Sequence, residues 1–223
     1  MSIREVSAQR EPAVLAAIGE LRYTVWGTEE GALDTTLPQF ADSSWLDASD
    51  AETSEKVRHF CAFAHDAGPG GGGASVLVGA SRLVLHRDAV TSGSDRDIAL
   101  WMRSDLNDNA SLRWPVCDLG RLVVARSHRG RGVATRLNAA RVAAARDSGA
   151  AMLIATASAS NARLLARHHG FIATGETITF DDRPDTLFYA VQKYLQPSQR
   201  ASSDPRARIA VRTRTSAAPS TAW

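Results

Sequence analysis

The sequence predicts an α/β fold: one domain with a central mixed β-sheet of about seven strands flanked by helices. Two β-like runs, 57–65 and 75–86, are joined by a glycine-rich stretch that is typical of a hairpin connection. Farther along the chain, two helix-like segments, 132–148 and 161–169, alternate with apolar β-like runs, and each is followed by a glycine. At 223 residues, 44% of them hydrophobic, the chain is long enough for one good core and a tail.

The first expected elements are a short strand at 3–6 and a helix over 12–25. In that helix the apolar residues recur once per helical turn, and Pro12 suits a first turn. The segment 27–55 is polar and lacks strong periodicity. So long a loop inside a compact domain is uncommon unless it is functional, so we expect it to contribute to a site.

The later elements centre on a long strand over 115–125, reached through a polar segment at 87–110 that contains a short helix around 98–106. Gly120 lies within the long strand and is expected to mark a β-bulge. The elements that follow are helix 132–148, strand 151–157, helix 161–169 capped by Ser158 or Ser160, and strands 172–180 and 187–194.

Positive charge is concentrated at the C-terminal end. From Gln196 to Trp223 there are five arginines and one aspartate, a net charge of +4, whereas the preceding 195 residues have 21 basic and 23 acidic side chains. The stretch is rich in Ser, Ala, Pro and Arg, so we expect a domain over 1–195 and a disordered tail over 196–223. Scattered arginines without interleaved aromatic residues are a weak signal, and no nucleic-acid partner is predicted.

Membrane, secreted and metal-binding classes fit the sequence poorly. No apolar run approaches the roughly 20 residues that span a membrane, and the N-terminus lacks the apolar region of a secretory signal. Cys61 and Cys117 are too few for a disulfide framework, and neither has a second Cys or a His at metal-ligand spacing. We therefore expect buried free thiols, no metal and a cytoplasmic location.

Residues 121–134 read RLVVARSHRGRGVA, which is a strand, an arginine-bearing loop and the start of a helix. Unpaired amides and the helix dipole favour an anion at a helix N-terminus, and Gly130 and Gly132 let it approach the backbone. Arg129 and Arg131 could add charge-assisted hydrogen bonds. A dinucleotide-binding loop is the weaker alternative, because Thr135 stands where its third glycine belongs.

The RGRGVA stretch resembles the acyl-CoA-binding signature of the GNAT superfamily of N-acyltransferases, and NARLLARHHGF resembles a later motif of that family. The resemblance covers about residues 1–195. It implies acyl-CoA, acetyl-CoA being the simplest case, as co-substrate, with the pyrophosphate on backbone amides and the pantetheine between two splayed strands. The expected contacts are Leu122, Val123, Val124, Arg129, Gly130, Arg131, Gly132, Val133, Ala134, Thr135 and Asn161.

A finer resemblance is to the branch with acyl-homoserine lactone synthases and N-acyl amino acid synthases. The matching stretches are ELRYTVW, the acids of the 27–55 segment, GASRL and CDLGRLVV. This chain keeps the glycine-rich loop that many of those synthases lack, which favours acyl-CoA over an acyl carrier protein as donor. Trp26 could stack on the acceptor or simply pack. The resemblance implies a substrate site shaped by Arg22, Asp47, Asp50, Arg82, Asp118 and Arg121, and Trp26 is a further candidate contact.

Two catalytic candidates follow. An amine must be neutral to attack a thioester, and Asp118, where the synthases carry Glu, is the expected base. The alternative is a structural partner of Arg121 or Arg82. Ala166 occupies the position of the family's usual general acid, a Tyr, so His168 or His169 could return the proton to sulfur. Alternatively, histidines in this last helical turn could simply interact favourably with the helix dipole.

The sequence therefore favours an N-acyltransferase that moves an acyl group, most simply acetyl, from acyl-CoA to the amine of a small molecule. One alternative is a long-chain N-acyl amino acid or acyl-homoserine lactone-type synthase. Another is a non-catalytic module that binds acyl-CoA. The sequence leaves the oligomeric state open, with a homodimer among the alternatives.

Overall fold

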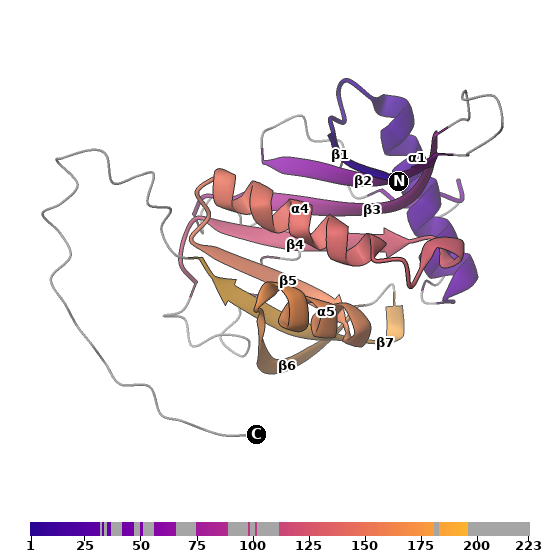
Figure 1. Cartoon of the computed structure of the whole chain (residues 1–223). Coiled ribbons are helices and arrows are strands. Elements are labelled where there is room, and N and C mark those ends of the chain that lie inside the picture. The colour runs from indigo at the N-terminus through magenta and orange to yellow at the C-terminus, as the bar shows by residue number, and fades with distance from the viewer. Residues whose placement is uncertain are drawn as a thin grey trace, which may run out of the picture.

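The computed structural model describes residues 1–31, 33, 35–36, 42–46, 50, 56–65, 75–88, 98, 101, 112–180 and 183–195. In these residues, seven strands form one sheet in the order β1-β2-β3-β4-β5-β7-β6 (Figure 1). The strands are β1 (Ser2–Val6), β2 (Val57–His65), β3 (Ser75–His86), β4 (Val116–Val124), β5 (Met152–Ser158), β6 (Ile172–Phe180) and β7 (Arg183–Tyr194). The α-helices are α1 (Pro12–Tyr23), α4 (Val133–Asp147) and α5 (Ala159–His169).

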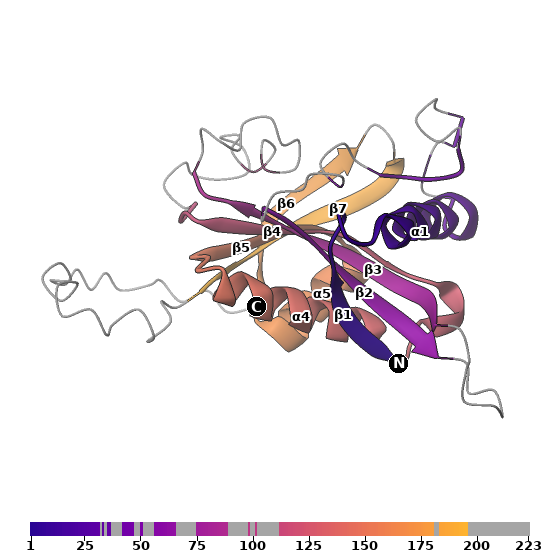
Figure 2. The same ribbon diagram turned by 90° about the horizontal axis from the view of Figure 1, so that it is seen from above.

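The sheet is mixed, as expected, with a single parallel pair between β4 and β5. Figure 2 shows α1 against one face of the sheet and α4 with α5 against the other. Alternate residues of β2 supply the two cores: Phe60 and Ala62 pack in the cluster that includes α4, and Cys61 and Phe63 pack in the cluster that includes α1. The predicted α/β fold is confirmed.

Most predicted boundaries agree with the structure, and two differ. The first helix changes at Thr24 into a π-helical segment, η1 (Thr24–Glu29), which extends it to the edge of the site. The last strand begins at Arg183, before the predicted start at 187, because Arg183 pairs with Phe180 of β6. The 98–106 helix, apart from residues 98 and 101, and the 196–223 tail lie outside the described residues.

The β4 bulge lies one residue beyond the predicted position. The register with β3 changes from Ala80↔Val123 to Arg82↔Gly120, so two residues of β4 oppose Ser81 alone. Arg121 has a φ of 55°, the left-handed conformation that bulges use and that non-glycine residues rarely adopt. The prediction of Gly120 as the bulge residue is therefore wrong, because Arg121 takes the turned conformation.

Both cysteines are buried and free, as predicted. Burial disfavours the thiolate and raises the pKa of Cys61 and of Cys117 to about 12. Within the part of the chain that the structure describes, no helix is long and apolar enough to cross a membrane. The described residues likewise contain no cluster of His, Cys, Asp and Glu able to hold a metal ion.

Candidate active site

A cavity of about 540 Å³ opens where β4 and β5 diverge. The two strands pair only through 116–118 and 152–154, so their remaining halves separate and leave room between them. The cavity is lined by Val25, Trp26, Glu30, residues 118–124, 128–130, 132–135 and 156–158, and by Ser160, Asn161, Leu164 and Phe188. Ten of the eleven predicted acyl-CoA contacts line it; Arg131, which is exposed, does not.

The glycines before α4 form an open approach to the helix N-terminus. Gly130 and Gly132 have φ values of 73° and 75°, and Gly132 is the N-cap of α4. A Cβ at either position would meet nothing within 4 Å, so the backbone here faces open space. The first amides of α4 therefore lie at the cavity wall, where the helix dipole favours an anion.

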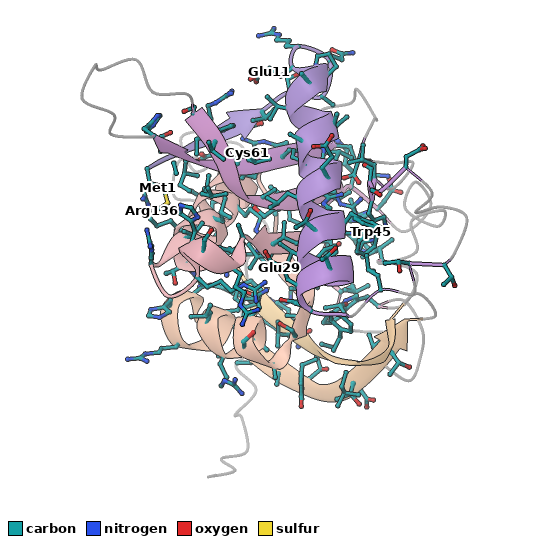
Figure 3. All side chains as sticks on the ribbon, turned by 90° about the vertical axis from the view of Figure 1, so that its right-hand side faces the viewer. Met1, Glu11, Glu29, Trp45, Cys61 and Arg136 are labelled. Atoms are coloured by element: carbon teal, nitrogen blue, oxygen red, sulfur yellow. The ribbon has the colours of Figure 1, made fainter. Side chains whose placement is uncertain are left out.

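Arg129 ties this loop to η1. Its Nη2 lies 3.1 Å from Glu29 and 2.9 Å from Glu30, and its Nε donates to the Val124 carbonyl at 3.0 Å. Glu29 lies at the end of the long helix that α1 and η1 form (Figure 3). The guanidinium therefore already has carboxylate partners at the edge of the cavity, which the sequence could not show because Glu29 precedes Arg129 by 100 residues.

Asp118 lies at the point where β4 and β5 separate. It is buried, only 3% exposed, and it lines the cavity. Its charge acts on Arg141 of α4, which is fully buried. The placement suits a base for a substrate bound in the cavity, and it also places the carboxylate near a cation that sequence reasoning did not consider.

The comparisons with known proteins agree with this geometry. The family model "Acetyltransferase (GNAT) family" matches residues 37–171, more than half of the chain. The chain belongs to the GNAT acetyltransferase family. The predicted resemblance is thereby confirmed at the level of family and fold.

Three solved structures illustrate the GNAT fold that this chain shares. The CoA-dependent acyl-homoserine lactone synthase MesI is 18% identical, with TM-score 0.56 and 90% of this chain and 94% of MesI covered. FeeM, an N-acyl amino acid synthase from uncultured soil microbes, is 14% identical, with TM-score 0.51 and coverages of 87% and 95%. An acyl-CoA N-acyltransferase from Pseudomonas aeruginosa is 17% identical, with TM-score 0.53 and coverages of 86% and 98%. No curated protein matches the sequence.

Two of the predicted substrate residues, Trp26 and Arg121, line the cavity. Trp26 packs against Trp45 at 4.5 Å between ring centroids, with the planes inclined by 60°. The Arg121 guanidinium lies 5.3 Å from the centre of the Trp45 ring. Trp26 thus packs against Trp45 and also faces the cavity. This position is compatible with both roles considered from the sequence, packing and stacking on an acceptor.

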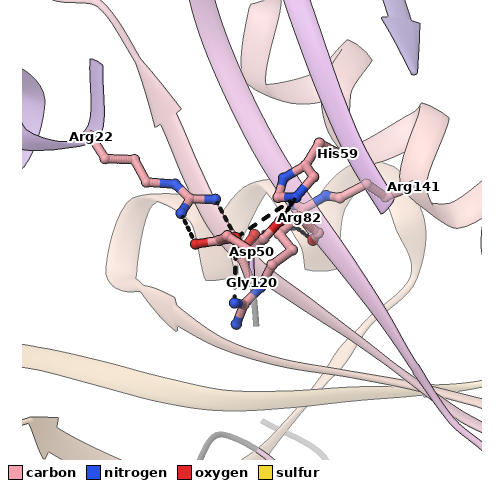
Figure 4. A network of polar contacts seen from close by, with 6 residues as sticks. All are labelled: Arg22, Asp50, His59, Arg82, Gly120 and Arg141. Carbon is pink, nitrogen blue, oxygen red and sulfur yellow. Dashed lines mark hydrogen bonds and ion pairs between the residues drawn. The ribbon is translucent and has the colours of Figure 1, made fainter. Parts of the chain in front are cut away.

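Three of the predicted substrate residues are buried instead. Arg22 donates to both carboxylate oxygens of Asp50, at 2.6 and 3.3 Å, and Arg82 lies 3.5 Å from the same carboxylate (Figure 4). All three side chains are at most 2% exposed, and none lines the cavity. These three side chains support the cavity wall from behind, and in this arrangement they do not contact a substrate in the cavity. Asp47 lies outside the described residues.

His59 completes this buried cluster. Its Nε2 lies 3.1 Å from the Asp50 carbonyl oxygen. Burial, together with the charges of Arg22 and Arg82, lowers the pKa of His59, although the Asp50 carboxylate opposes that shift. The neutral imidazole is therefore the form that the folded protein favours.

We expect the wild-type protein to lose stability as pH falls through about 6.5, the ordinary pKa of histidine, because the unfolded chain then binds a proton that folded His59 resists. His59→Gln retains a side-chain donor for the Asp50 carbonyl and does not titrate. Its free energy of unfolding should therefore fall less between pH 7.5 and pH 5 than that of the wild type, as measured by urea denaturation. Parallel losses in the two proteins would contradict this expectation.

His168 does not reach the GNAT site. It is exposed in the last turn of α5 and does not line the cavity, so its placement does not support the catalytic role considered for it. The adjacent His169 interacts with the Thr135 backbone, and burial lowers its pKa. Hydroxyl groups of Ser158 and Ser160, 3.2 Å apart at the start of α5, do line the cavity.

Sequence reasoning also missed two polar residues of α4. Arg141 and Asn138 are fully buried on the helix face that packs against the sheet. In the sequence they occupy the sheet-facing positions of an amphipathic helix, where apolar residues are usual. Polar residues at these positions were the signal that could have identified them. Buried polar side chains of this kind are retained only when bonded, which makes their partners informative.

Proposed function

We propose that the protein is an acyl-CoA-dependent N-acyltransferase whose acceptor is the amine of a small molecule. The observation that carries the proposal is one cavity that joins the glycine-lined start of α4, the divergence of β4 from β5, and Asp118. A pyrophosphate, an extended thioester arm and an amine need these three features side by side.

In this proposal the donor enters across the start of α4. The amides after Gly132 donate hydrogen bonds to the pyrophosphate, and the arm of the donor follows the edge of β4 that is not paired with β5 toward Asp118. Asn161, at the start of α5, lines the same path and offers an amide group to the arm. A backbone N–H of β4 near the bulge stabilises the oxyanion that forms at the thioester.

Asp118 prepares the acceptor. The amine nitrogen attacks the thioester carbonyl carbon, so a C–N bond forms and the C–S bond breaks. The proton lost by the nitrogen passes to Asp118 or to a water that it orients. The sulfur leaves as a thiolate and takes a proton from solvent or from a hydroxyl at the start of α5, because the helix position of the family's usual Tyr holds Ala166.

A long-chain synthase is the second candidate, and the apolar part of the wall favours it. Trp26, Leu119, Leu164 and Phe188 all line the cavity, and their side chains could accompany an acyl chain longer than acetyl. MesI is named as an acyl-homoserine lactone synthase and FeeM as an N-acyl amino acid synthase. Chain length therefore separates the two candidates.

Calorimetry with CoA and a free-thiol assay test the proposal. We expect CoA to bind, and acetyl-CoA or a longer acyl-CoA to release thiol only when a suitable amine from a panel of neutral, basic and carboxylate-bearing amines is present. Preference for longer chains would favour the synthase. Binding without turnover across the panel would favour a non-catalytic acyl-CoA-binding module, and absence of CoA binding would contradict the donor site itself.

A further inference from the structure

Arg141, in the middle of α4, is the residue that the proposed mechanism leaves unexplained. Its side chain is fully buried beneath the sheet. Burial lowers its pKa to about 9, and the charge of Asp118 opposes that shift. A buried guanidinium costs free energy that a Leu or Met at the same position would not. The contacts of the guanidinium must therefore explain why an arginine occupies this buried position.

One end of the guanidinium holds the edge of the β4 bulge. Nη1 donates to the carbonyl oxygen of Gly120 at 3.0 Å and to that of Arg82 at 3.2 Å (Figure 4). These two residues are the register pair at which the β3–β4 ladder resumes after the bulge. A bulge disrupts the ladder locally, and Arg141 supplies a donor from α4 at that place. The guanidinium thereby fixes the position at which the bulge begins, next to Arg121 with its left-handed backbone.

The other end of the guanidinium leads to the donor half of the cavity. Nη2 donates to Oδ1 of Asn138, and Nδ2 of Asn138 donates to Oδ1 of Asn161 at 3.0 Å. Asn161 lines the cavity at the start of α5. The hydrogen bonds therefore run without interruption from the bulge of β4, through α4, to the first turn of α5.

We propose that Arg141 is a positioning residue for acyl transfer, which holds the β4 bulge and Asn161 in a fixed mutual arrangement. The proposal rests on the proposed function. The bulge backbone faces the reacting thioester, whereas Asn161 faces the arm of the donor. A rigid connection between them fixes the carbonyl carbon relative to Asp118, and a misplacement of about 1 Å can cost about 10²-fold in rate.

Arg141→Lys is the principal test. The lysine amine keeps a nitrogen donor beside Asp118 but cannot hold two carbonyls and Asn138 together in the fork geometry of a guanidinium. We expect kcat to fall by about 10²-fold. The Kd for CoA, measured by calorimetry, should change less than threefold, because the amides at the start of α4 are untouched. A role limited to stability would lower the melting temperature and leave kcat of the folded enzyme unchanged.

Asn138→Ala tests the part of the connection that leads to the donor. It removes the link to Asn161 together with the acceptor for Nη2 of Arg141, whereas the bonds from Nη1 of Arg141 to Gly120 and Arg82 remain in place. We expect weaker CoA binding, by about tenfold, the scale of one lost hydrogen bond in a buried site, and a smaller fall in kcat than in Arg141→Lys, because Arg141 still holds the bulge. If Arg141→Lys does not fold, this variant decides: unchanged CoA affinity would overturn the proposal.

Arg146→Met serves as the matched control, since Arg146 is exposed in the last turn of the same helix. It should leave both kcat and the Kd for CoA at wild-type values. A folded Arg141→Lys enzyme with wild-type kcat would overturn the inference while leaving the proposed function standing. A wild-type protein that neither binds CoA nor releases thiol would instead remove the proposed function on which the inference rests.

Discussion

Asp118→Asn is expected to lower turnover by about 10²-fold or more, the usual scale for loss of a general base. The amide keeps the size of the carboxylate and most of its hydrogen-bond geometry, so the substitution changes charge far more than packing. The Kd for CoA should barely change, because Asp118 lies at the divergence of β4 and β5 and not at the start of α4. Thiol release under saturating acyl-CoA and amine measures the effect.

The pH dependence of that loss distinguishes the two roles of Asp118. If the carboxylate removes a proton from the amine, the defect shrinks as pH rises, because more of the amine is then already neutral. If Asp118 serves mainly to balance the buried charge of Arg141, the variant should melt at a lower temperature and its defect should not respond to pH. Asp147→Asn, on the exposed end of α4, is the control. Full activity of Asp118→Asn at neutral pH would remove the residue from the mechanism.

The elements that position the site could be predicted from the sequence because local signals agree with the tertiary structure. The run 57–65 alternates between two cores and forms β2 with the predicted bounds. The glycines at 130 and 132 stand where left-handed backbone opens the start of α4. The alternation along β2 and the left-handed glycines before α4 depend on local conformation, which can be predicted well from the sequence.

Partners far apart in the sequence could not be predicted in the same way. The acids Glu29 and Glu30 bind Arg129, which the sequence assigned to an anionic ligand. Arg22 and Arg82 were assigned to the substrate, yet they meet at Asp50 in the interior. In each case the residue type was informative, but the choice between a ligand and an internal carboxylate depends on the packing of α1 and η1 against the sheet.

Gly132→Glu is expected to abolish measurable CoA binding while the protein remains folded. The new side chain would project into open space at the cavity wall, and its carboxylate would lie where the donor's pyrophosphate is proposed to bind. It would accept from the free amides of α4 and repel phosphate. A residue with a Cβ is strained at a φ of 75°, so stability should fall by about 1 kcal/mol. Calorimetry with CoA and circular dichroism measure the two effects.

Two matched variants separate charge from backbone strain. Gly132→Gln carries the same strain and nearly the same volume without the charge, so it should retain part of the CoA affinity. Gly149, just past the other end of α4, has a φ of 74° and equally open surroundings. Gly149→Glu should therefore cost similar stability but leave CoA affinity unchanged, because a carboxylate there faces no donor. If a folded Gly132→Glu protein bound CoA as well as Gly149→Glu does, the start of α4 would not be the pyrophosphate site.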